Sequence, residues 1–245
     1  MPKAKRAPAN PDQFAEASAW FRSRTPVTRA EWDAMSRQAR RQAFTVAGTQ
    51  QLKVVQVVFE ELQRAIDKGT PIAAWRKAIK KRIKGDFADR NSGTLTTAFI
   101  NANQTAYNTG RWYQLSDPAV TSVLPLRIYD SVLDHRTTEI CRSLNGTIRR
   151  HDDPFWLTHW CPMHHRCRSS VRALSEAMAK RRGGITQELP RPNIPDDFGL
   201  APPLRAGQIW EPKREDFDPS AWAIYQRSQE RMKKRLRPAN DNAGK

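Results

Sequence analysis

The feature that most constrains this chain is the crowding of its sulfur and imidazole groups into one stretch. All three cysteines and all five histidines of the 245 residues lie between Asp134 and Arg168. The members of this set are Cys141, Cys161, Cys167, His135, His151, His159, His164 and His165. These side chains bind transition metals and exchange protons near neutral pH, so metal or acid–base chemistry is expected here.

A zinc site is the first interpretation of this stretch. Cys161, His164 and Cys167 form a C-x2-H-x2-C pattern, whose short gaps suit a tight loop with its side chains directed at one ion. Cys141, farther upstream, supplies a third thiolate. The four together predict a tetrahedral Cys3His site for structural zinc. A neighbour could also provide the imidazole, namely His165 or His135.

The cysteine count also bears on the compartment. Three is an odd number, and the basic start Met1–Arg6 is not followed by the apolar run that a secretory signal needs. A reducing compartment is therefore expected, in which the thiols are metal ligands or stay free rather than forming a disulfide framework. Free thiols and polar loop histidines are the alternative to the zinc site.

A second interpretation of the same stretch is a metal-independent nuclease, or a related nucleic-acid-processing enzyme. The general acid, the general base and the phosphate clamp would come from His135, Arg136, His151 and His159 beside Asp134. In a basic protein such clusters serve more often in hydrogen bonding and anion contact, so we expect that the protein is not an enzyme.

Two short motifs in the stretch predict turns. Asp134-x-Arg136 follows a predicted strand and can close a turn in which a guanidinium binds a carboxylate through two hydrogen bonds. Asn145-Gly146 is typical of a type I′ hairpin turn, because both central positions of that turn need a positive φ. Asp134, Arg136, Asn145 and Gly146 are therefore interpreted as structural residues.

The first half of the chain predicts helices. Residues 1–10 are basic and contain prolines, so we expect a disordered arm. Over residues 11–116 apolar side chains recur at spacings of three and four, and Gly69 is the expected C-cap of the clearest helix. Thr28 and Glu31 form a capping-box pattern. Helices are expected over residues 11–24, 28–43, 50–68, 70–84 and 94–115.

The pattern changes at Asp117, and a small β-containing Cys/His module is predicted over residues 117–182. Alternating β-favouring residues predict a strand over 120–129 with an irregularity at Pro125, a closing strand over 171–174 and a short helix over 175–182. Residues 183–245 are rich in proline and predict an extended tail rather than a packed element, with a basic helix near the end. The fold class is therefore α+β.

The charge of the chain predicts a polyanionic partner. The formal net charge is +17, which favours binding to a polyanion such as nucleic acid. No stretch approaches the ~20 apolar residues that a membrane span needs. Two basic helices could contact double-stranded DNA without reading its sequence, and such binding should weaken steeply with salt. Their candidate DNA-contacting residues are Arg76, Lys77, Lys80, Lys81, Lys84, Arg231, Lys233, Lys234 and Arg235.

Several short motifs, taken in order, resemble a known family. They run from Ala19 to about Leu174 and are listed here: Ala19–Arg24, Ala43–Gly48, Ala65–Gly69, Asn103–Asn108 with Gly110-Arg111, Asp134–Thr137, Leu144–Gly146, Asp152–Trp156 and Cys167-Arg168. In this respect the chain resembles the phage Mu F-like minor head proteins, the head-morphogenesis family of tailed phages and prophages.

The resemblance implies a structural part of the virion head, built in the host cytoplasm, near the portal protein and in contact with the major capsid or scaffold protein and packaged DNA. It implies no membrane partner. Many relatives carry a C-x2-C pair and a terminal Cys-Arg-Cys, whereas this chain has Thr138 and Ser169 at two of those cysteine positions. Cys161 is an additional cysteine, so a metal site here would use a changed set of ligands.

Overall fold

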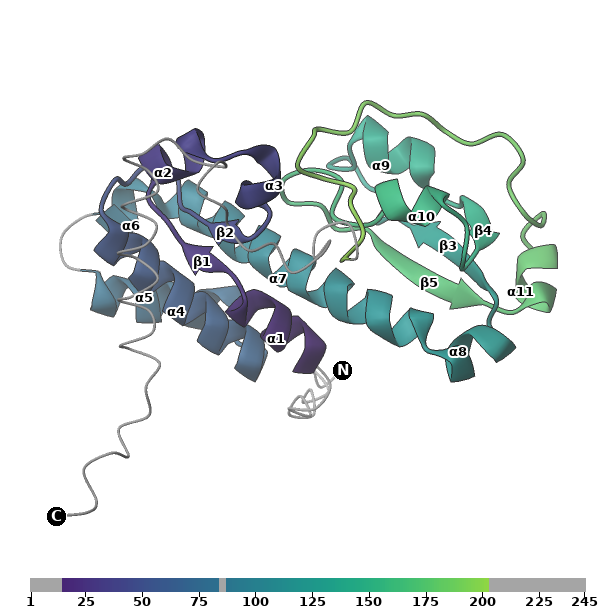
Figure 1. Cartoon of the computed structure of the whole chain (residues 1–245), viewed down its shortest axis with the longest axis horizontal. Coiled ribbons are helices and arrows are strands. Elements are labelled where there is room, and N and C mark those ends of the chain that lie inside the picture. Colours follow the sequence, from purple (N-terminus) through teal and green to yellow (C-terminus); the bar gives the residue numbers. More distant parts are fainter. Residues whose placement is uncertain (1–14, 84–86, 203–245) are drawn as a thin grey trace, which may run out of the picture.

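The computed structural model describes residues 15–83 and 87–202, which form a helical part and a smaller sheet-containing part joined by one long helix (Figure 1). This arrangement confirms the predicted α+β class. No helix within these ranges is both long enough and apolar enough to cross a bilayer. The predicted basic arm, Lys84 and everything after residue 202, including the predicted basic helix, lie outside the described residues.

The helical part surrounds one apolar core. Its helices are α1 (Ala15–Arg22), α2 (Arg29–Ala34), α3 (Arg37–Arg40), α4 (Leu52–Lys68), α5 (Ile72–Arg82), α6 (Phe87–Arg90) and α7 (Ser92–Ser116). Two short strands, β1 (Thr25–Pro26) and β2 (Ala43–Phe44), pair in parallel beside them. The apolar stripe of α4 packs against α1, α5 and α7, and its buried residues include Val58 and Leu62.

Helix ends in this part follow the local sequence signals. The capping box at Thr28 and Glu31 is present, and Gly69 ends α4 with a φ of 60°. Both predictions are confirmed. The helix expected over residues 28–43 is instead split into α2 and α3, because the backbone turns to an extended conformation at Met35.

The second part is built on a three-stranded antiparallel sheet of order β4-β3-β5. Its elements are α8 (Pro118–Val123), β3 (Leu126–Asp130), α9 (Glu139–Leu144), β4 (Ile148–Arg150), α10 (Phe155–Thr158), β5 (Ser170–Leu174) and α11 (Glu176–Lys180). The central strand β3 places Leu126 opposite Arg150 on one side and opposite Leu174 on the other. Helix α7 runs along this part and contacts β5.

Three predictions about this second part were wrong. Residues 118–123 form a helix rather than the start of a strand, because Asp117 caps the first turn and Pro118 occupies a position that suits proline. The predicted tail packs in part: the N–H of Trp160 donates to the carbonyl of Gly199 at 2.7 Å, and the N–H of Ala201 donates to that of Leu157 at 2.9 Å.

The third wrong prediction is the hairpin turn at Asn145-Gly146, because these residues link α9 to β4 instead of joining two strands. Asn145 has a φ of −59° and ψ of 131°, and Gly146 has a φ of 82°. The N–H of Thr147 donates to the carbonyl of Leu144 at 3.1 Å across them. These angles are those of a type II turn, which needs a positive φ only at its third residue.

Candidate metal centre

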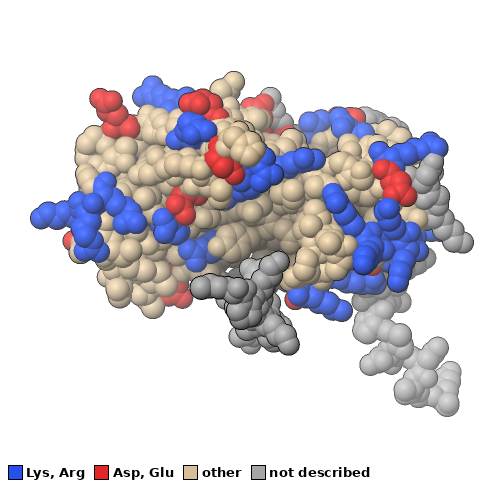
Figure 2. Space-filling model, turned by 180° about the vertical axis from the view of Figure 1, so that it is seen from behind, with Lys and Arg blue, Asp and Glu red and all other residues tan. Residues whose placement is uncertain are grey.

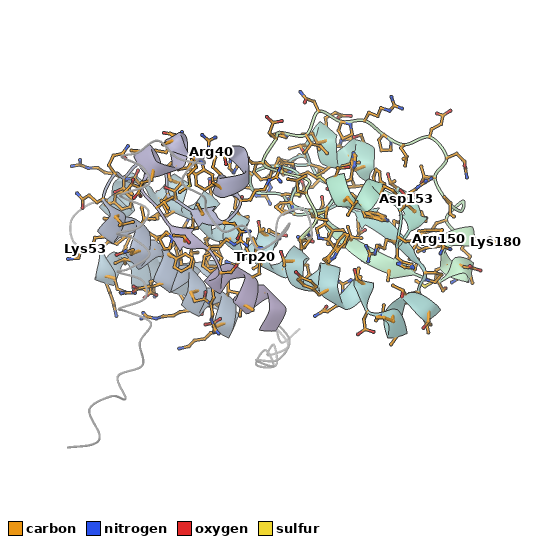
Figure 3. The ribbon with its side chains drawn as sticks, viewed as in Figure 1. Trp20, Arg40, Lys53, Arg150, Asp153 and Lys180 are labelled. Carbon is orange, nitrogen blue, oxygen red and sulfur yellow. The ribbon has the colours of Figure 1, made fainter. Side chains whose placement is uncertain are left out.

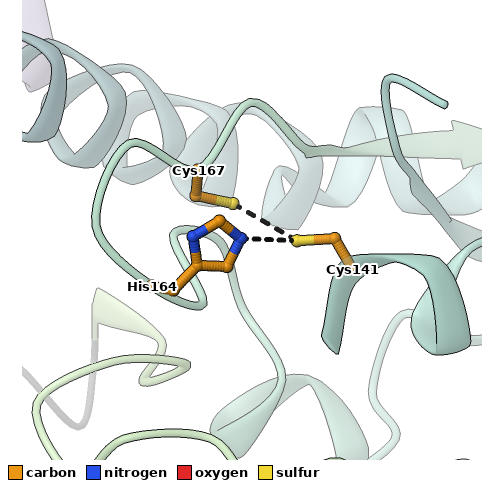
Figure 4. Close-up of side chains that lie close together, drawn as sticks. All are labelled: Cys141, His164 and Cys167. Atoms are coloured by element: carbon orange, nitrogen blue, oxygen red, sulfur yellow. Dashed lines mark hydrogen bonds between the residues drawn. The ribbon is translucent and has the colours of Figure 1, made fainter. Parts of the chain in front are cut away.

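Three of the four predicted zinc ligands meet in the sheet-containing part. Cys141 lies in the first turn of α9, and His164 and Cys167 lie in the loop between α10 and β5 (Figure 4). Thr138 is the N-cap of α9, and its hydroxyl accepts from the N–H of Cys141 at 3.4 Å. The cap fixes the start of α9, and the Cys141 side chain in its first turn faces the loop.

The distances within this trio suit one metal ion. Sγ of Cys141 lies 3.1 Å from Nε2 of His164 and 3.7 Å from Sγ of Cys167, and the three ligand atoms all lie within 4.8 Å of one another. A tetrahedral zinc ion with Zn–S bonds of about 2.3 Å separates two sulfurs by roughly 3.8 Å. The two thiols are free cysteines, and their separation is far from the roughly 2.05 Å of a disulfide.

The orientation of His164 leaves the right nitrogen for a metal. Its Nδ1 lies 2.8 Å from the backbone carbonyl of His165, which can only accept a hydrogen bond, so Nδ1 carries the proton. The lone pair then lies on Nε2, which faces Cys141 and the hydroxyl of Thr138 at 2.9 Å. Backbone carbonyls commonly hold metal-binding histidines in this way.

The electrostatics favour a thiolate at one member of the trio. Hydrogen bonds from Cys141 first, and then from Cys161, lower the pKa of Cys167 well below its usual range. The pKa of Cys141 is raised, chiefly by its hydrogen bond to Cys167 and also by burial. The interaction of His164 with Cys167 raises the pKa of the His164 imidazole. A negative charge at Cys167 prepares the site for a cation, because the thiolate is the form that binds metal.

The fourth predicted ligand, Cys161, lies beside the trio rather than within it. Its side chain is buried and hydrogen-bonds with Cys167 and Tyr129, and burial raises its pKa well above the usual value. The hydroxyl of Tyr129 lies 3.4 Å from Sγ of Cys141. The alternative imidazoles lie elsewhere: Nδ1 of His165 is 2.7 Å from the side-chain amide of Asn101, and His135 is exposed.

The loop that carries His164 and Cys167 is attached to α7. Arg166 donates from its backbone N–H to Oδ1 of Asn101 at 2.8 Å, and its guanidinium reaches the Thr97 hydroxyl at 2.8 Å and the Gly93 carbonyl at 3.0 Å. Arg166 adopts a φ of 57°, which a residue with a side chain rarely does. The contacts with α7 therefore hold this loop in a strained conformation.

The predicted Asp134 turn is present, but the guanidinium comes from another residue. The N–H of Arg136 donates to Oδ1 of Asp134 at 2.9 Å, which closes the turn. The two-pronged partner is Arg168, with both N–O distances at 2.6 Å. This pairing holds the pKa of Asp134 well below its usual range. It connects the loop after β3 to the residue that follows Cys167.

Two of the residues proposed for nuclease chemistry, Asp134 and His159, have other partners in the structure. The carboxylate of Asp134 is occupied by Arg168. His159 stacks on Phe155 at a centroid distance of 4.2 Å and contacts that residue's carbonyl, and burial lowers its pKa. Within residues 15–83 and 87–202, the metal-compatible group of histidines, cysteines and carboxylates is the Cys141 trio.

The predicted DNA-contacting residues on α5 lie at the surface but differ in their partners. Arg76, Lys77, Lys80 and Lys81 are all exposed. Lys80 pairs with Asp89, and Arg76 contacts the hydroxyl of Thr96. On the face shown in Figure 2, basic side chains gather toward the two ends of the molecule. The remaining predicted residues, Lys84, Arg231, Lys233, Lys234 and Arg235, lie outside the described residues.

Sequence reasoning missed the residues that surround the trio. Thr138 and Tyr129 touch its ligand atoms, and Arg168 holds the neighbouring loop. A threonine three residues before Cys141 is a readable N-cap signal. Tyr129 meets Cys141 across 12 residues of sequence, and Arg168 meets Asp134 across 34, so no local pattern identifies these two contacts.

Comparisons with known proteins place this architecture in context. Residues 56–172 match a family described as Phage Mu protein F like protein. The putative capsid assembly protein F of Escherichia phage Mu is 30% identical over 185 residues, which cover 69% of this chain and 42% of that protein. The Mu-like prophage FluMu F protein of Haemophilus influenzae is 30% identical over 165 residues, 62% of this chain and 39% of that protein. The matched region thus spans about two fifths of each relative. No solved structure matches the chain.

Proposed function

This chain belongs, through residues 56–172, to the phage Mu protein F-like family, and on that premise we propose that it is a structural protein of head assembly in a tailed phage or prophage. The observation that carries the proposal is its likeness to a protein named as a putative capsid assembly protein. The final location is the virion head, reached by assembly in the host cytoplasm. The partners are the portal protein and the major capsid or scaffold protein.

A structural zinc ion at the Cys141, His164 and Cys167 trio is part of the proposal, with Cys161 as the fourth ligand. The support is the convergence of two thiols and one imidazole nitrogen at distances that suit a tetrahedral ion. Zinc would supply cross-linking of α9 to the loop before β5. The chain's own residues hold the ligands: Thr138 caps α9, and the carbonyl of His165 orients the imidazole.

Nonspecific contact with packaged DNA is the second part of the proposal. The support is the net charge of +17 and the exposed basic side chains of α5. Lys77 and Lys81 are the strongest candidates on this helix, because Lys80 already pairs with Asp89. Phosphate contacts of this kind act by charge and release counterions, so affinity should fall steeply with salt.

The role in assembly is tested by deleting the gene from the phage or prophage that carries it. We expect aberrant or empty heads in electron micrographs, and mass spectrometry should find the protein in purified wild-type heads. Normal infectious heads that assemble without the protein would contradict the role. Complementation with the intact gene is the control for polar effects on neighbouring genes.

The DNA part is tested separately with a short DNA duplex in a salt titration. The double variant Lys77→Gln, Lys81→Gln should bind more weakly, and each lost phosphate contact should lower the slope of log affinity against log salt by about 1. The matched control is Lys180→Gln, at the far end of the molecule on α11. Equal slopes in all three proteins would remove α5 from the DNA contact.

A further inference from the structure

The two members of the trio that lie in the loop before β5 are the ends of one β-turn. The N–H of Cys167 donates to the carbonyl of His164 at 3.3 Å, so His165 and Arg166 are the central residues of the turn. Arg166 has a φ of 57°, and among the described residues it is the one residue other than glycine with a positive φ. A positive φ at the third position alone is typical of a type II turn.

Type II differs from the commoner type I in the orientation of the central peptide. The two types share the first φ and the last ψ, and they differ in the two torsions on either side of the bond between the second and third residues. Type I has a negative φ at both central residues, whereas type II favours glycine at the third. An arginine at position 166 therefore favours type I, so a contact from elsewhere must hold the type II orientation.

Asn101 provides that contact. It lies on α7, the helix that runs from the helical part to the sheet-containing part (Figure 3). Its Oδ1 accepts from the backbone N–H of Arg166 at 2.8 Å, and its amide nitrogen lies 2.7 Å from Nδ1 of His165. Because a backbone N–H can only donate, the amide oxygen must face Arg166, and the amide nitrogen is left to donate to His165. One side chain of α7 thus holds both central residues of the turn.

The peptide that Asn101 holds also orients a metal ligand. A trans peptide is planar, so its N–H and C=O point in opposite directions. The N–H of the peptide between His165 and Arg166 faces Asn101, and the carbonyl of the same peptide lies 2.8 Å from Nδ1 of His164. If this peptide turned over to type I, Asn101 would lose its donor and the imidazole of His164 would lose its acceptor.

From this geometry we propose that Asn101 is a positioning residue for the metal site. It keeps the peptide between His165 and Arg166 in the type II orientation, and the carbonyl of that peptide keeps Nε2 of His164 directed toward the two thiols. Loss of a hydrogen-bonding partner behind a ligand typically weakens metal binding by about 10- to 100-fold. The inference rests on the proposed zinc site and extends it to a residue of the long helix.

The test compares zinc dissociation constants of full-length proteins in competition with a chromophoric chelator. Asn101→Ala should bind zinc about tenfold or more weakly than the wild type. The matched control is Asn103→Ala, also on α7, because the Asn103 side chain donates to the carbonyl of Phe99 within the same helix at 2.9 Å. This control should bind zinc as tightly as the wild type.

The failures of the two proposals are distinguishable in this experiment. If the wild type binds zinc and Asn101→Ala binds it equally well, the inference is overturned and the zinc site stands. If Asn103→Ala weakens binding as much as Asn101→Ala, the effect is a general one of α7 and the inference is again overturned. A wild type that binds no zinc overturns the zinc site and the inference together.

A pair of double variants separates positioning from general damage to the fold. Both combine Asn101→Ala with a change at Arg166, so both lose the guanidinium contacts with Thr97 and Gly93. Glycine adopts a positive φ without penalty, so Asn101→Ala with Arg166→Gly should recover most of the lost affinity, whereas Asn101→Ala with Arg166→Ala should not. The visible absorption of the cobalt(II)-loaded proteins, which reports ligand geometry, should return to that of the wild type in the glycine variant. Equal affinities and spectra in the two double variants would overturn the inference.

Discussion

The two parts of the chain have interiors of different chemistry. The helical part packs aromatic and aliphatic side chains against one another, as where Phe21 stacks on Phe59 at a centroid distance of 4.8 Å beside Leu62. The sheet-containing part buries three thiols and the side chains of Tyr129 and Arg127 among its apolar residues. The helical part also buries a few charged groups, such as Glu31 and Glu61, beside its apolar cluster, whereas the sheet-containing part places its three thiols and Tyr129 within the cluster itself.

Arg127 illustrates the difference. Its guanidinium lies between Trp112 and Trp160, at 4.9 Å and 5.4 Å from their ring centroids, and donates to the carbonyl of Leu115 at 3.0 Å. Burial lowers its pKa to about 10. Apolar packing stabilises without direction, but buried polar groups stabilise only when each is satisfied. The sheet-containing part therefore depends on specific bonds, and the proposed zinc ion would be the strongest of them.

Removal of zinc should have the largest effect on this contrast. Cys167→Ser, or a chelator added to the wild type, should destabilise the sheet-containing part by about 3 kcal/mol or more, because structural metal binding contributes directly to folding. Hydrogen exchange read by mass spectrometry should show loss of protection in β3 and β5 and retained protection in α4. Zinc content gives the independent measure.

A companion variant, Cys161→Ser, removes the thiol that is proposed as the fourth ligand. If Cys161 is the fourth ligand, zinc content falls in this variant too. If the site uses only the trio, zinc content stays unchanged. Wild-type protein that contains no zinc, or equal loss of protection in α4 and β3, would contradict the contrast between the two parts.

A cavity in the apolar core should have the next largest effect. Leu62 is fully buried in α4, so Leu62→Ala should lower the free energy of unfolding by about 3 kcal/mol, as measured by urea denaturation. The cost should be the same with and without chelator. Leu144→Ala, equally buried in α9 close to Cys141, is the matched variant, and its cost should change when zinc is removed. If chelator changes the cost of Leu62→Ala as much as the cost of Leu144→Ala, the two parts do not differ in their dependence on zinc.

The sequence predicts the helical part better because its signals are local. Three signals each act within a few residues: the spacing of apolar residues in α4, the left-handed glycine Gly69 at its end, and the capping box at Thr28. Asp117-Pro118 is also a local helix signal, but the β-favouring residues after it mask it. The prediction of a strand there was therefore wrong because the β-favouring residues were given more weight than the helix signal at Asp117-Pro118.

The site was predictable only in part for the same reason. The C-x2-H-x2-C spacing leads to His164 and Cys167, which meet Cys141. The bond between Asp134 and Arg168 and the position of Cys161 outside the trio depend on how the loop folds back. Those relations span long separations in sequence, and no periodicity or spacing encodes them.

Arg166 tests how far the two parts depend on each other, and its effect should be smaller than that of the core variants. Arg166→Ala removes the contacts with Thr97 and Gly93 but keeps the strained φ, and should cost about 1 kcal/mol. Arg166→Gly removes the same contacts and relieves the strain, so it should be more stable than the alanine variant. Urea denaturation compares the two, and an alanine variant as stable as the glycine variant would contradict the strain.

The smallest expected effect is the acid sensitivity of the Asp134–Arg168 pair. The pKa of Asp134 is depressed in the folded protein, so its stabilisation is present above the unfolded pKa of about 3.9 and is lost as pH falls through the folded value. Asp134→Asn should therefore be less stable than the wild type at neutral pH, and the difference should shrink below about pH 4. Side chains of both partners are about one-third exposed, so high salt should also reduce the difference. Asp152→Asn breaks the more exposed pair with Arg150 and serves as the control. Of these two pairs, the Asp134 pair joins loops that are distant in sequence, whereas the Asp152 pair does not. If Asp152→Asn loses as much stability as Asp134→Asn, then surface charge, and not the connection between the loops, sets the acid sensitivity of the sheet-containing part.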